Sequence, residues 1–179
     1  TDPTSIAKTG LDVEHTGTIA DGQTQSFAFT ATAGTVVMLE KSGENLSYSI
    51  VDETAGTSPD AAKPFLLENS GSYRVEVSNF SGAAQDFRFR VVDLTSLTSL
   101  VTIGTPVIGS TDVFTSVAFH GTGLAGQQID FGSSNNARLY YLADTSQSVP
   151  AVGLQTLPQD GDFFIVVSRP FTGENEFEI

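Results

Sequence analysis

The stretch Gly71-Ser-Tyr-Arg-Val-Glu-Val-Ser78 has the pattern of a turn followed by a half-buried strand. Apolar side chains at Tyr73, Val75 and Val77 alternate with polar ones, so the predicted strand has one apolar and one polar face. The stretch Gly161-Asp-Phe-Phe-Ile-Val-Val-Ser168 repeats this pattern 90 residues later. A recurrence at this distance predicts two copies of one domain.

The composition favours strands throughout the chain. Among 179 residues there are 17 Gly and seven Pro, and β-branched and aromatic residues fill alternate positions between polar turns. No segment keeps a period near 3.6 residues with good helix formers over three turns. We therefore predict an all-β protein made of two tandem jelly-roll-like β-sandwich domains related by internal duplication.

The pattern also sets the expected domain boundaries. Residues 1–10 form an N-terminal arm, 11–94 the first sandwich, 95–100 a short polar linker and 101–179 the second sandwich. When the two copies are aligned, the chain stops at the position of Phe89, so the last strand of the second domain is expected to be incomplete. Either a longer chain continues beyond this point, or another segment completes that edge by strand addition.

The alignment pairs further strands of the two copies. Ser116-Val-Ala-Phe119 is expected to correspond to Ser26-Phe-Ala-Phe29, which places His120 at the position of Thr30. Other expected correspondences are Tyr140–Asp144 with Tyr48–Asp52, and Gly173–Phe177 with Gly82–Phe87.

Charge and targeting signals exclude several classes of function. The net charge is −13, and the eight Lys and Arg residues do not cluster, which argues against nucleic acid and anionic membranes as partners. No apolar run has the length of a membrane span. The chain begins with Thr1 rather than Met, so it is expected to be processed or part of something longer. The absence of Cys excludes a disulfide framework and is compatible with secretion from a bacterium.

The first copy contains a series of short motifs: Gly17-Thr-Ile19, Ser26-Phe-Ala-Phe29, Ala33-Gly34, Tyr48–Asp52, Ser70–Val77 and Asp86–Phe89. Together these motifs resemble the bacterial pre-peptidase C-terminal domain family. The resemblance covers nearly the whole chain as two copies, and the second copy departs from it in a two-residue insertion before Gly126 and in Phe163 for Tyr. It implies a jelly-roll-like sandwich, found beside secreted hydrolases and as tandem repeats in large extracellular proteins.

Calcium is the cofactor that best suits these residues. The family resembles collagen-binding modules, some of which bind Ca²⁺, and carboxylates are the oxygen ligands that this ion prefers. Asp160 and Asp162 lie in the loop before the repeated strand, and Asp112 and Asp144 are expected to add oxygens. Turn formation explains Asp-Gly pairs without any metal. The corresponding residues of the first copy are Asp21, Asp52 and Glu53.

Catalysis has little support in the sequence. The two His residues are His15 and His120, and no Gly-x-Ser-x-Gly turn is present. With no Cys and two His, a Cys/His zinc site is not expected. We predict that the chain is not an enzyme.

Three aromatic residues break the core pattern of the second copy. Tyr141 and Phe164 are expected to point away from the core, and Phe171 follows Pro170 in a turn. Exposed rings of this kind stack on a sugar or pack against a neighbouring domain. Leu97 and Leu100 in the linker are expected to set the angle between neighbouring units.

These features predict a non-catalytic structural or adhesive repeat segment, or a fibre subunit, of an extracellular or cell-surface protein. Its expected partners are neighbouring copies or domains of the same protein. The alternative is a carbohydrate- or matrix-protein-binding module appended to a secreted hydrolase. Exposed aromatics on a flat sheet face favour the binding module, and aromatics buried at domain or subunit contacts favour the structural role.

Overall fold

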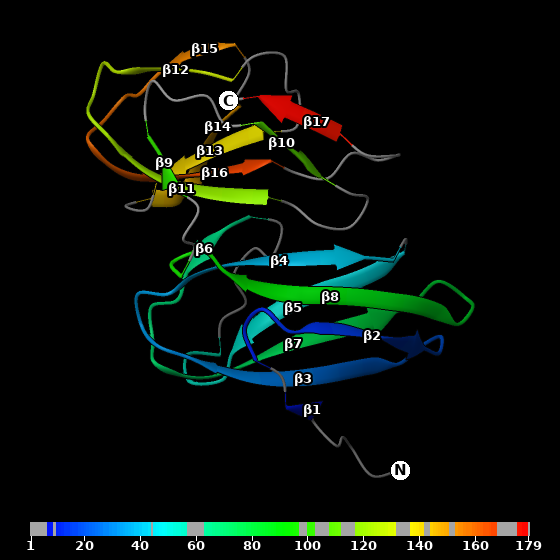
Figure 1. Cartoon of the computed structure of the whole chain (residues 1–179). Coiled ribbons are helices and arrows are strands. Elements are labelled where there is room, and N and C mark those ends of the chain that lie inside the picture. Colours follow the sequence, from blue (N-terminus) through cyan, green and yellow to red (C-terminus); the bar gives the residue numbers. More distant parts are fainter. Residues whose placement is uncertain are drawn as a thin grey trace. The chain divides into compact units, whose positions relative to one another are not determined.

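A computed structural model of the chain contains strands as its only regular elements in the part that it describes (Figure 1). The all-β prediction is confirmed. The chain divides into two compact units, Thr1–Asp93 and Leu94–Ile179. No described element is a helix long and apolar enough to cross a membrane. The described residues are 7–8, 10–43, 45–56, 63–96, 100–102, 108–111, 117–131, 137–141, 144–150, 153–167 and 175–178.

The first unit consists of two four-stranded sheets. Neighbouring strands run antiparallel, except that β1 lies parallel to β3. The two sheets are the layers of the unit that contains β1 to β8 in Figure 1. One sheet has the order β1 (Ala7–Lys8), β3 (Thr24–Ala31), β7 (Gly71–Asn79), β5 (Leu46–Asp52), and the other has the order β2 (Glu14–Ile19), β8 (Gln85–Asp93), β4 (Val36–Ser42), β6 (Phe65–Leu66).

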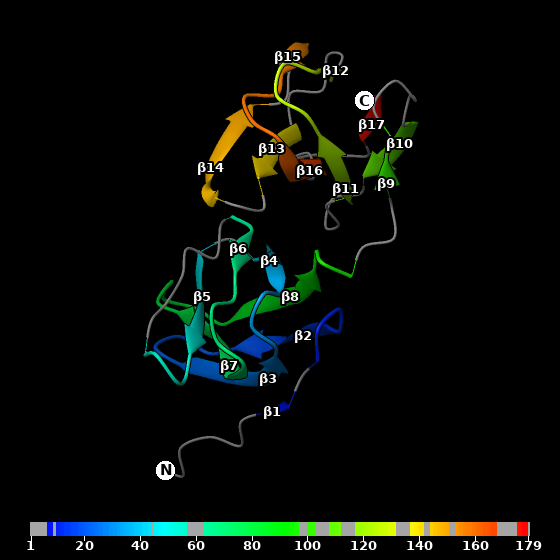
Figure 2. The same ribbon diagram turned by 90° about the vertical axis from the view of Figure 1, so that its left-hand side faces the viewer.

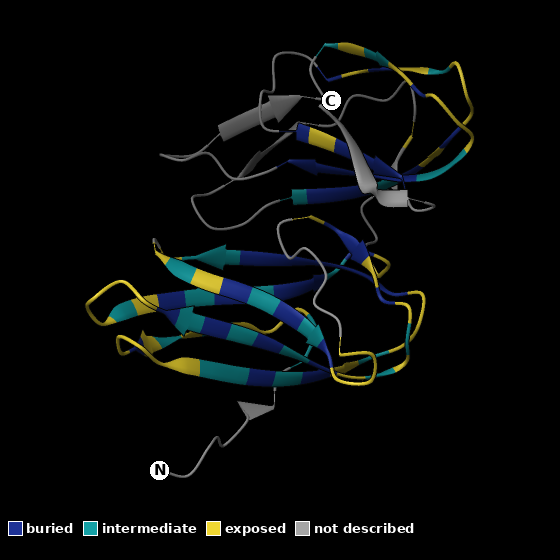
Figure 3. Cartoon of the chain, turned by 180° about the vertical axis from the view of Figure 1, so that it is seen from behind, coloured by how far each residue is buried: buried dark blue, intermediate teal, exposed yellow. Residues whose placement is uncertain are grey.

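The core of the first unit lies between these sheets. Along β7, Tyr73, Val75 and Val77 are buried while the residues between them are partly exposed, as the alternation predicts. Figure 3 shows the same banding on the neighbouring strands of this unit. Phe27 of one sheet packs edge-to-face on Phe89 of the other, with ring centroids 4.9 Å apart. Apolar contact between the inner faces is the arrangement of a β-sandwich.

The second unit has a larger sheet and two short strand pairs. Its core contains the buried side chains of Phe131, Phe163 and Ile165. Figure 2 shows the extra strand β14 at one edge of the larger sheet. That sheet has the order β14 (Asp144–Pro150), β13 (Ala137–Tyr141), β16 (Gly161–Val167), β11 (Val117–Gly123), β9 (Leu100–Val101), while β10 (Ile108–Thr111) pairs with β17 (Asn175–Glu178) and β12 (Gln128–Asp130) with β15 (Leu154–Thr156).

The same turn contact occurs in both units. In the first unit the Gly34 N–H donates to the Leu67 carbonyl at 2.9 Å, and in the second the Gly126 N–H donates to the Leu157 carbonyl at 2.8 Å. Both glycines have left-handed φ angles, +91° and +87°, which favour Gly over residues with a Cβ. A parallel edge strand is also present in each unit, because β9 lies parallel to β11 as β1 lies parallel to β3.

Strand register tests the alignment that the sequence predicts. Phe177 lies opposite Gly109 in the second unit, and Phe87 lies opposite Gly17 in the first, so each Phe has a glycine as its partner on the neighbouring strand. β8 continues beyond this pair to Asp93 and joins β4, whereas the description of β17 ends at Glu178.

The predicted correspondence of Tyr140 with Tyr48 is wrong by three residues. Tyr48 lies opposite Val77, and the residue opposite Val167 is Ala137. Side chains alternate between the two faces of a strand, so a shift by an odd number of residues exchanges the faces. Tyr141 therefore lies in the core cluster of the second unit, and the expectation that it points away from the core is wrong.

A second shift, by two residues, leaves the faces unchanged. Phe119 lies opposite Ile165 as Phe27 lies opposite Val75, so Phe119 corresponds to Phe27 rather than Phe29. The ring of Phe119 still belongs to the core because two is a full period of the strand. By the same register His120 takes the position of Ala28, not that of Thr30.

The predicted linker, residues 95–100, differs from the structure at its last residue. Leu100 was expected to lie between the domains, but it begins β9 and pairs with β11 of the second unit, opposite His120. Leu97 lies outside the described residues.

Candidate functional site

Asp160 and Asp162, the two predicted calcium ligands whose side chains are described, accept local hydrogen bonds. Asp160 Oδ1 accepts from the Ala125 N–H at 2.7 Å. In the first unit the Ser70 hydroxyl oxygen accepts from the Ala33 N–H at 2.8 Å, in the same turn. A neutral Ser and a charged Asp thus make the same bond, and turn formation accounts for Asp160 without a metal.

Asp162 lies on the outer face of the sheet, beside His120. Its Oδ1 accepts from Thr122 Oγ1 at 2.7 Å and lies 3.9 Å from His120 Nε2. The His120 ring stacks on the ring of Phe164, with centroids 5.2 Å apart, and its buried Nε2 has no hydrogen-bond partner among the described residues. The sequence did not predict this neighbourhood, because His120 was aligned with the wrong residue.

The other two predicted calcium ligands lie wholly or partly outside the described residues. Asp112 lies outside the described residues, and the backbone of Asp144 begins β14 opposite Tyr141 while its side chain lies outside the description. Among the side chains that the structure describes, no three His, Cys, Asp or Glu residues form a group suited to a metal ion. Calcium binding stays a prediction.

The corresponding acids of the first unit are held in turns and ion pairs. Asp52 accepts hydrogen bonds from Asn69 Nδ2 at 2.9 Å, from the Thr54 N–H at 2.8 Å and from the Ala55 N–H at 3.0 Å. These bonds, that from Asn69 first, lower the pKa of Asp52 because they favour its charged form. Glu53 instead pairs with a guanidinium on β7.

The aromatic residues predicted as contacts are not exposed where they are described. Phe164 lies outside the core cluster, on the face that the sequence predicted, yet its ring is buried. Burial raises the pKa of the Tyr141 hydroxyl, and that oxygen has no hydrogen-bond partner in the described part of the chain. Phe171 lies outside the described residues.

The most exposed aromatic side chain of the described residues is one that was not predicted from the sequence. Phe80 is 73% exposed and lies between β7 and β8. We call residues 79–84 the Phe80 tip. The other exposed large apolar side chains in the described ranges are aliphatic: Val13, Leu66, Leu124 and Leu154.

A fully buried amide holds the tip together. Asn79 Nδ2 donates to the Ile19 carbonyl at 2.9 Å and to the Ala83 carbonyl at 2.7 Å. Its Oδ1 accepts from the N–H of Ser81 at 3.0 Å and from the hydroxyl of Ser81 at 2.8 Å. Both functions of the amide are therefore satisfied, by groups of the tip and by the Ile19 carbonyl of β2, as a buried polar group requires.

The turn between β2 and β3 is hydrogen bonded to the tip. The Gly22 N–H donates to the Asn79 carbonyl at 2.8 Å, and the Asn79 N–H donates to the Gln23 carbonyl at 3.0 Å. Asp21 Oδ1 accepts from the Gly82 N–H at 2.8 Å. The loop that presents Phe80 is thus fixed by hydrogen bonds on both sides.

A signal for the tip was present in the sequence. The triplet Phe80-Ser-Gly82 precedes β8, and Phe171-Thr-Gly173 occupies the stretch between β16 and β17. Of these two Phe residues, only Phe171 is predicted from the sequence as a contact in a turn. A repeated apolar residue in a turn is informative, because turn chemistry itself does not require an aromatic ring.

Comparison with known proteins does not assign the chain to a family. No protein-family model matches the chain, and no curated protein matches it either. One similar solved structure is PliG of Salmonella Typhimurium, a periplasmic inhibitor of g-type lysozyme: 15% identity over 48% of this chain and 97% of that one, TM-score 0.41. Another is the CUB1-EGF-CUB2 region of rat MASP-1, with 9% identity over 96% and 98% of the two chains and a TM-score of 0.25. Both TM-scores are too low to support conclusions about function.

Proposed function

We propose that the chain is a structural or adhesive repeat segment of an extracellular or cell-surface protein, built from two tandem jelly-roll-like sandwiches that arose by duplication and are similar to pre-peptidase C-terminal domains. The observation that carries this proposal is the recurrence of the same backbone contacts in both units. Gly34 and Gly126 make equivalent turn bonds, and each unit has a parallel edge strand. A chain that repeats one rigid unit is suited to spacing and projection.

The placement of aromatic side chains favours this role over that of a carbohydrate-binding module. Tyr141 and Phe164 are buried, and Phe80 projects from a turn rather than from a flat sheet face. The outer face of the first sheet carries Arg74, which is paired with Glu53 at 2.6 Å and Glu76 at 2.8 Å. Sugar recognition by a sheet face needs aromatic platforms beside free polar groups. Charged side chains already paired with each other do not supply them.

Electron microscopy with and without a calcium chelator tests the proposal. A structural segment is expected to show ordered filaments or two-lobed particles of constant shape, without affinity for polysaccharides or collagen-type fibres in a binding screen. A loss of shape or stability on chelation supports calcium as a stiffening ion, and no change removes the calcium prediction.

Selective binding of a polysaccharide or matrix fibre by the purified chain contradicts the structural proposal. In that case the binding module appended to a secreted hydrolase becomes the function to pursue. A binding signal that remains after heat denaturation is non-specific and does not count for either.

A further inference from the structure

The sequence contains the pattern Asn-x-Ser, in which x is not Pro, at two places in the first unit. The two occurrences are Asn45-Leu46-Ser47 and Asn79-Phe80-Ser81. In secreted proteins this pattern is the acceptor for N-linked glycosylation, in which an enzyme joins an oligosaccharide to the Asn side chain. A pattern of three residues also arises by chance, so its place in the fold decides whether a sugar fits there.

The first of these patterns lies at the surface. Asn45 is an exposed residue of the turn between β4 and β5, and Ser47 is exposed on β5. Between them, Leu46 is half-buried and packs against the core of the first unit. Because Leu46 is directed inward, the amide of Asn45 and the hydroxyl of Ser47 are both left in solvent. The two groups that a glycosylating enzyme reads are therefore accessible in the folded chain.

The backbone around Asn45 has a defined shape. Tyr48 donates its hydroxyl to the Ser42 carbonyl at 2.5 Å, which joins β5 to the end of β4 across the turn. The φ angle of Asn45 is +65°, a left-handed value that Asn adopts more readily than most residues with a Cβ. Turn geometry thus accounts for an Asn at this position, but it does not require a hydroxyl at Ser47.

The second pattern is closed by the fold. Asn79 is 0% exposed, and its amide nitrogen donates to the Ile19 carbonyl and to the Ala83 carbonyl. Both hydrogens of that nitrogen are therefore used. A sugar on Asn79 would replace one of these hydrogens and would need space that packed side chains already fill. The fold therefore excludes glycosylation of Asn79, and the two patterns give opposite predictions.

The Asn45 turn and the Phe80 tip lie at the same end of the sheet. In the pairing of β5 with β7, Leu46 lies opposite Asn79. Asn45 and Phe80 are the next residues beyond this pair. The Phe80 ring is 73% exposed, and an exposed aromatic face is a surface on which a sugar ring stacks. The tip thus supplies an apolar surface at the end of the sheet where a sugar on Asn45 begins.

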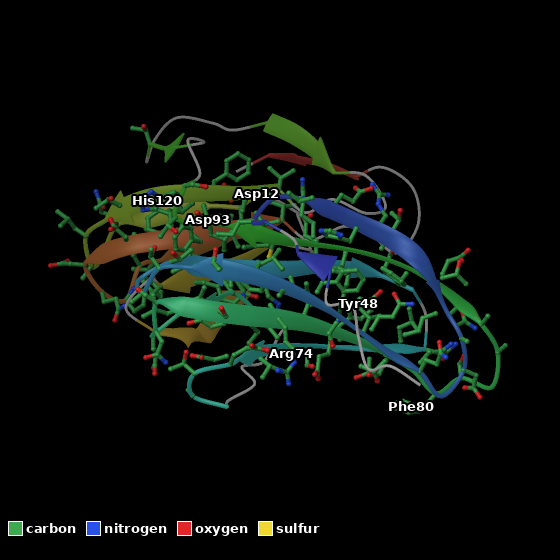
Figure 4. All side chains as sticks on the ribbon, turned by 90° about the horizontal axis from the view of Figure 1, so that it is seen from below. Asp12, Tyr48, Arg74, Phe80, Asp93 and His120 are labelled. Atoms are coloured by element: carbon green, nitrogen blue, oxygen red, sulfur yellow. The ribbon has the colours of Figure 1, made fainter. Side chains whose placement is uncertain are left out.

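This end of the first unit is remote from the point where the chain leaves it. Asp12 and Asp93 lie together where β2 begins and β8 ends, since the Asp93 N–H donates to Asp12 Oδ1 at 3.2 Å. Figure 4 shows these two residues far from Phe80. A bulky oligosaccharide on Asn45 therefore leaves the continuation of the chain toward Leu94 unobstructed.

We propose that Asn45 is a site of N-linked glycosylation and that Asn79 is not. The donor is an oligosaccharide linked through phosphate to a polyprenol lipid, and the enzyme is an oligosaccharyltransferase of the secretory membrane. The amide nitrogen of Asn45 bonds to C1 of the first sugar while the bond from C1 to the phosphate oxygen breaks. The lipid phosphate leaves with the electron pair, and the amide loses one proton. This inference rests on the proposed extracellular role, because the transfer takes place on the secretory route.

Mass spectrometry of tryptic peptides tests the inference on the full chain isolated from the cells that produce it. Trypsin cleaves after Lys and Arg but not before Pro64, so the two patterns fall in separate peptides, Ser42–Arg74 and Val75–Arg88. The first peptide is expected to carry the added mass of an oligosaccharide and to release sugar ions on fragmentation. The second peptide is expected at its unmodified mass.

Substitutions at Ser47 separate a glycosylation site from an Asn that only shapes a turn. Ser47→Ala keeps Asn45 and its left-handed backbone, and it is expected to lose the sugar because the enzyme requires the hydroxyl. Ser47→Thr retains a hydroxyl and is expected to retain the sugar. Ser49→Ala, two residues further along β5, is the matched control and should leave the sugar in place.

The inference and the proposed function fail by different observations. An unmodified Ser42–Arg74 peptide from the wild-type chain overturns the inference, and so does a sugar on Asn79 or a sugar that persists in Ser47→Ala. An unglycosylated chain that forms filaments or two-lobed particles keeps the structural role and loses only the site. Specific binding of a polysaccharide or matrix fibre by the purified chain removes the structural role, whatever the peptide masses show.

Discussion

The two units differ in one row, by which we mean three residues that lie side by side on neighbouring strands. In the first unit this row consists of Phe29, Tyr73 and Asp52, and in the second unit it consists of Gly121, Phe163 and Tyr141. In the first unit the ring beside Tyr73 is that of Phe29 on β3, and the two rings stack with centroids 5.5 Å apart. In the second unit the ring beside Phe163 is that of Tyr141 on β13, on the other side of the row, and Gly121 takes the place of Phe29.

The comparison shows that two different packings fill the same row. A Cβ at Gly121 would lie 2.5 Å from the ring of Phe163, so this ring covers the space that a side chain at 121 would need. Tyr141 supplies the bulk that the row lacks at Gly121. Cores accept such exchanges when the total volume is kept, and they do not accept an added group alone.

The polar groups of the row change together with the rings. Tyr73 donates its hydroxyl to the Asn69 carbonyl at 2.6 Å, and Asp52 accepts from the Asn69 side chain. In the second unit Phe163 has no hydroxyl, and the Tyr141 hydroxyl has no hydrogen-bond partner in the described part of the chain. One row is a satisfied polar cluster, and the other is almost wholly apolar.

The largest effect is expected from adding a methyl group at Gly121, where the packing of the two units differs most. Gly121→Ala is expected to lower the free energy of unfolding of the second unit by about 1–3 kcal/mol, because the buried Phe163 ring has to move. Native-state hydrogen exchange of β16 amides measures this loss separately from β7. Leu124→Ala, at an exposed position of the same unit, is the control. Unchanged protection of β16 in Gly121→Ala contradicts the packing described.

Removing the tyrosine hydroxyl from each row tests whether the two hydroxyls contribute differently to stability. Tyr73→Phe is expected to destabilise the first unit by about 1 kcal/mol, since the Asn69 carbonyl loses its donor. Tyr141→Phe is expected to leave the second unit unchanged or stabilise it by up to about 1 kcal/mol, because an unsatisfied buried hydroxyl is removed. Urea unfolding followed by hydrogen exchange measures both. Equal losses in the two variants are incompatible with this assignment.

The two rows are also expected to respond differently to low pH, because only the first contains a carboxylate, that of Asp52. The pKa of Asp52 is lowered in the folded state, so its contribution to stability is present above the unfolded value of about 3.9 and is lost as pH falls through the lower folded value. Unfolding of the first unit in urea at about pH 6 and about pH 3 measures this loss. Asp52→Asn is expected to show a smaller difference between the two pH values. An equally large difference in the variant shows that other carboxylates carry the effect.

The repeated strand and its alternation were enough to predict the all-β class and the core-facing residues of β7. The alignment between copies was less secure, and the size of each error decided its consequence. The two-residue shift at Phe119 kept that ring in the core, and the three-residue shift at Tyr140 reversed the faces of Tyr140 and Tyr141. Nothing in the local sequence distinguishes the two shifts, because both align apolar residues with apolar residues.

The candidate site was predicted less well than the fold. Asp-Gly pairs and carboxylates pointed to calcium, and where their side chains are described they bond to nearby backbone and side-chain groups. Phe80 was passed over because it lies in a turn, and its exposure depends on neighbours that only the folded chain supplies.

Alternation along single strands is local, so the sequence by itself determined the class, the recurrence of one strand pattern and the strongly acidic composition. Which strand lies beside which, and therefore which side chains share a row, depends on contacts between residues far apart in the chain. Tertiary structure alone decided that Gly121 and Tyr141 flank Phe163, and that a buried Asn79 holds Phe80 in solvent. Packing volume and hydrogen-bond satisfaction are properties of such neighbourhoods, not of segments.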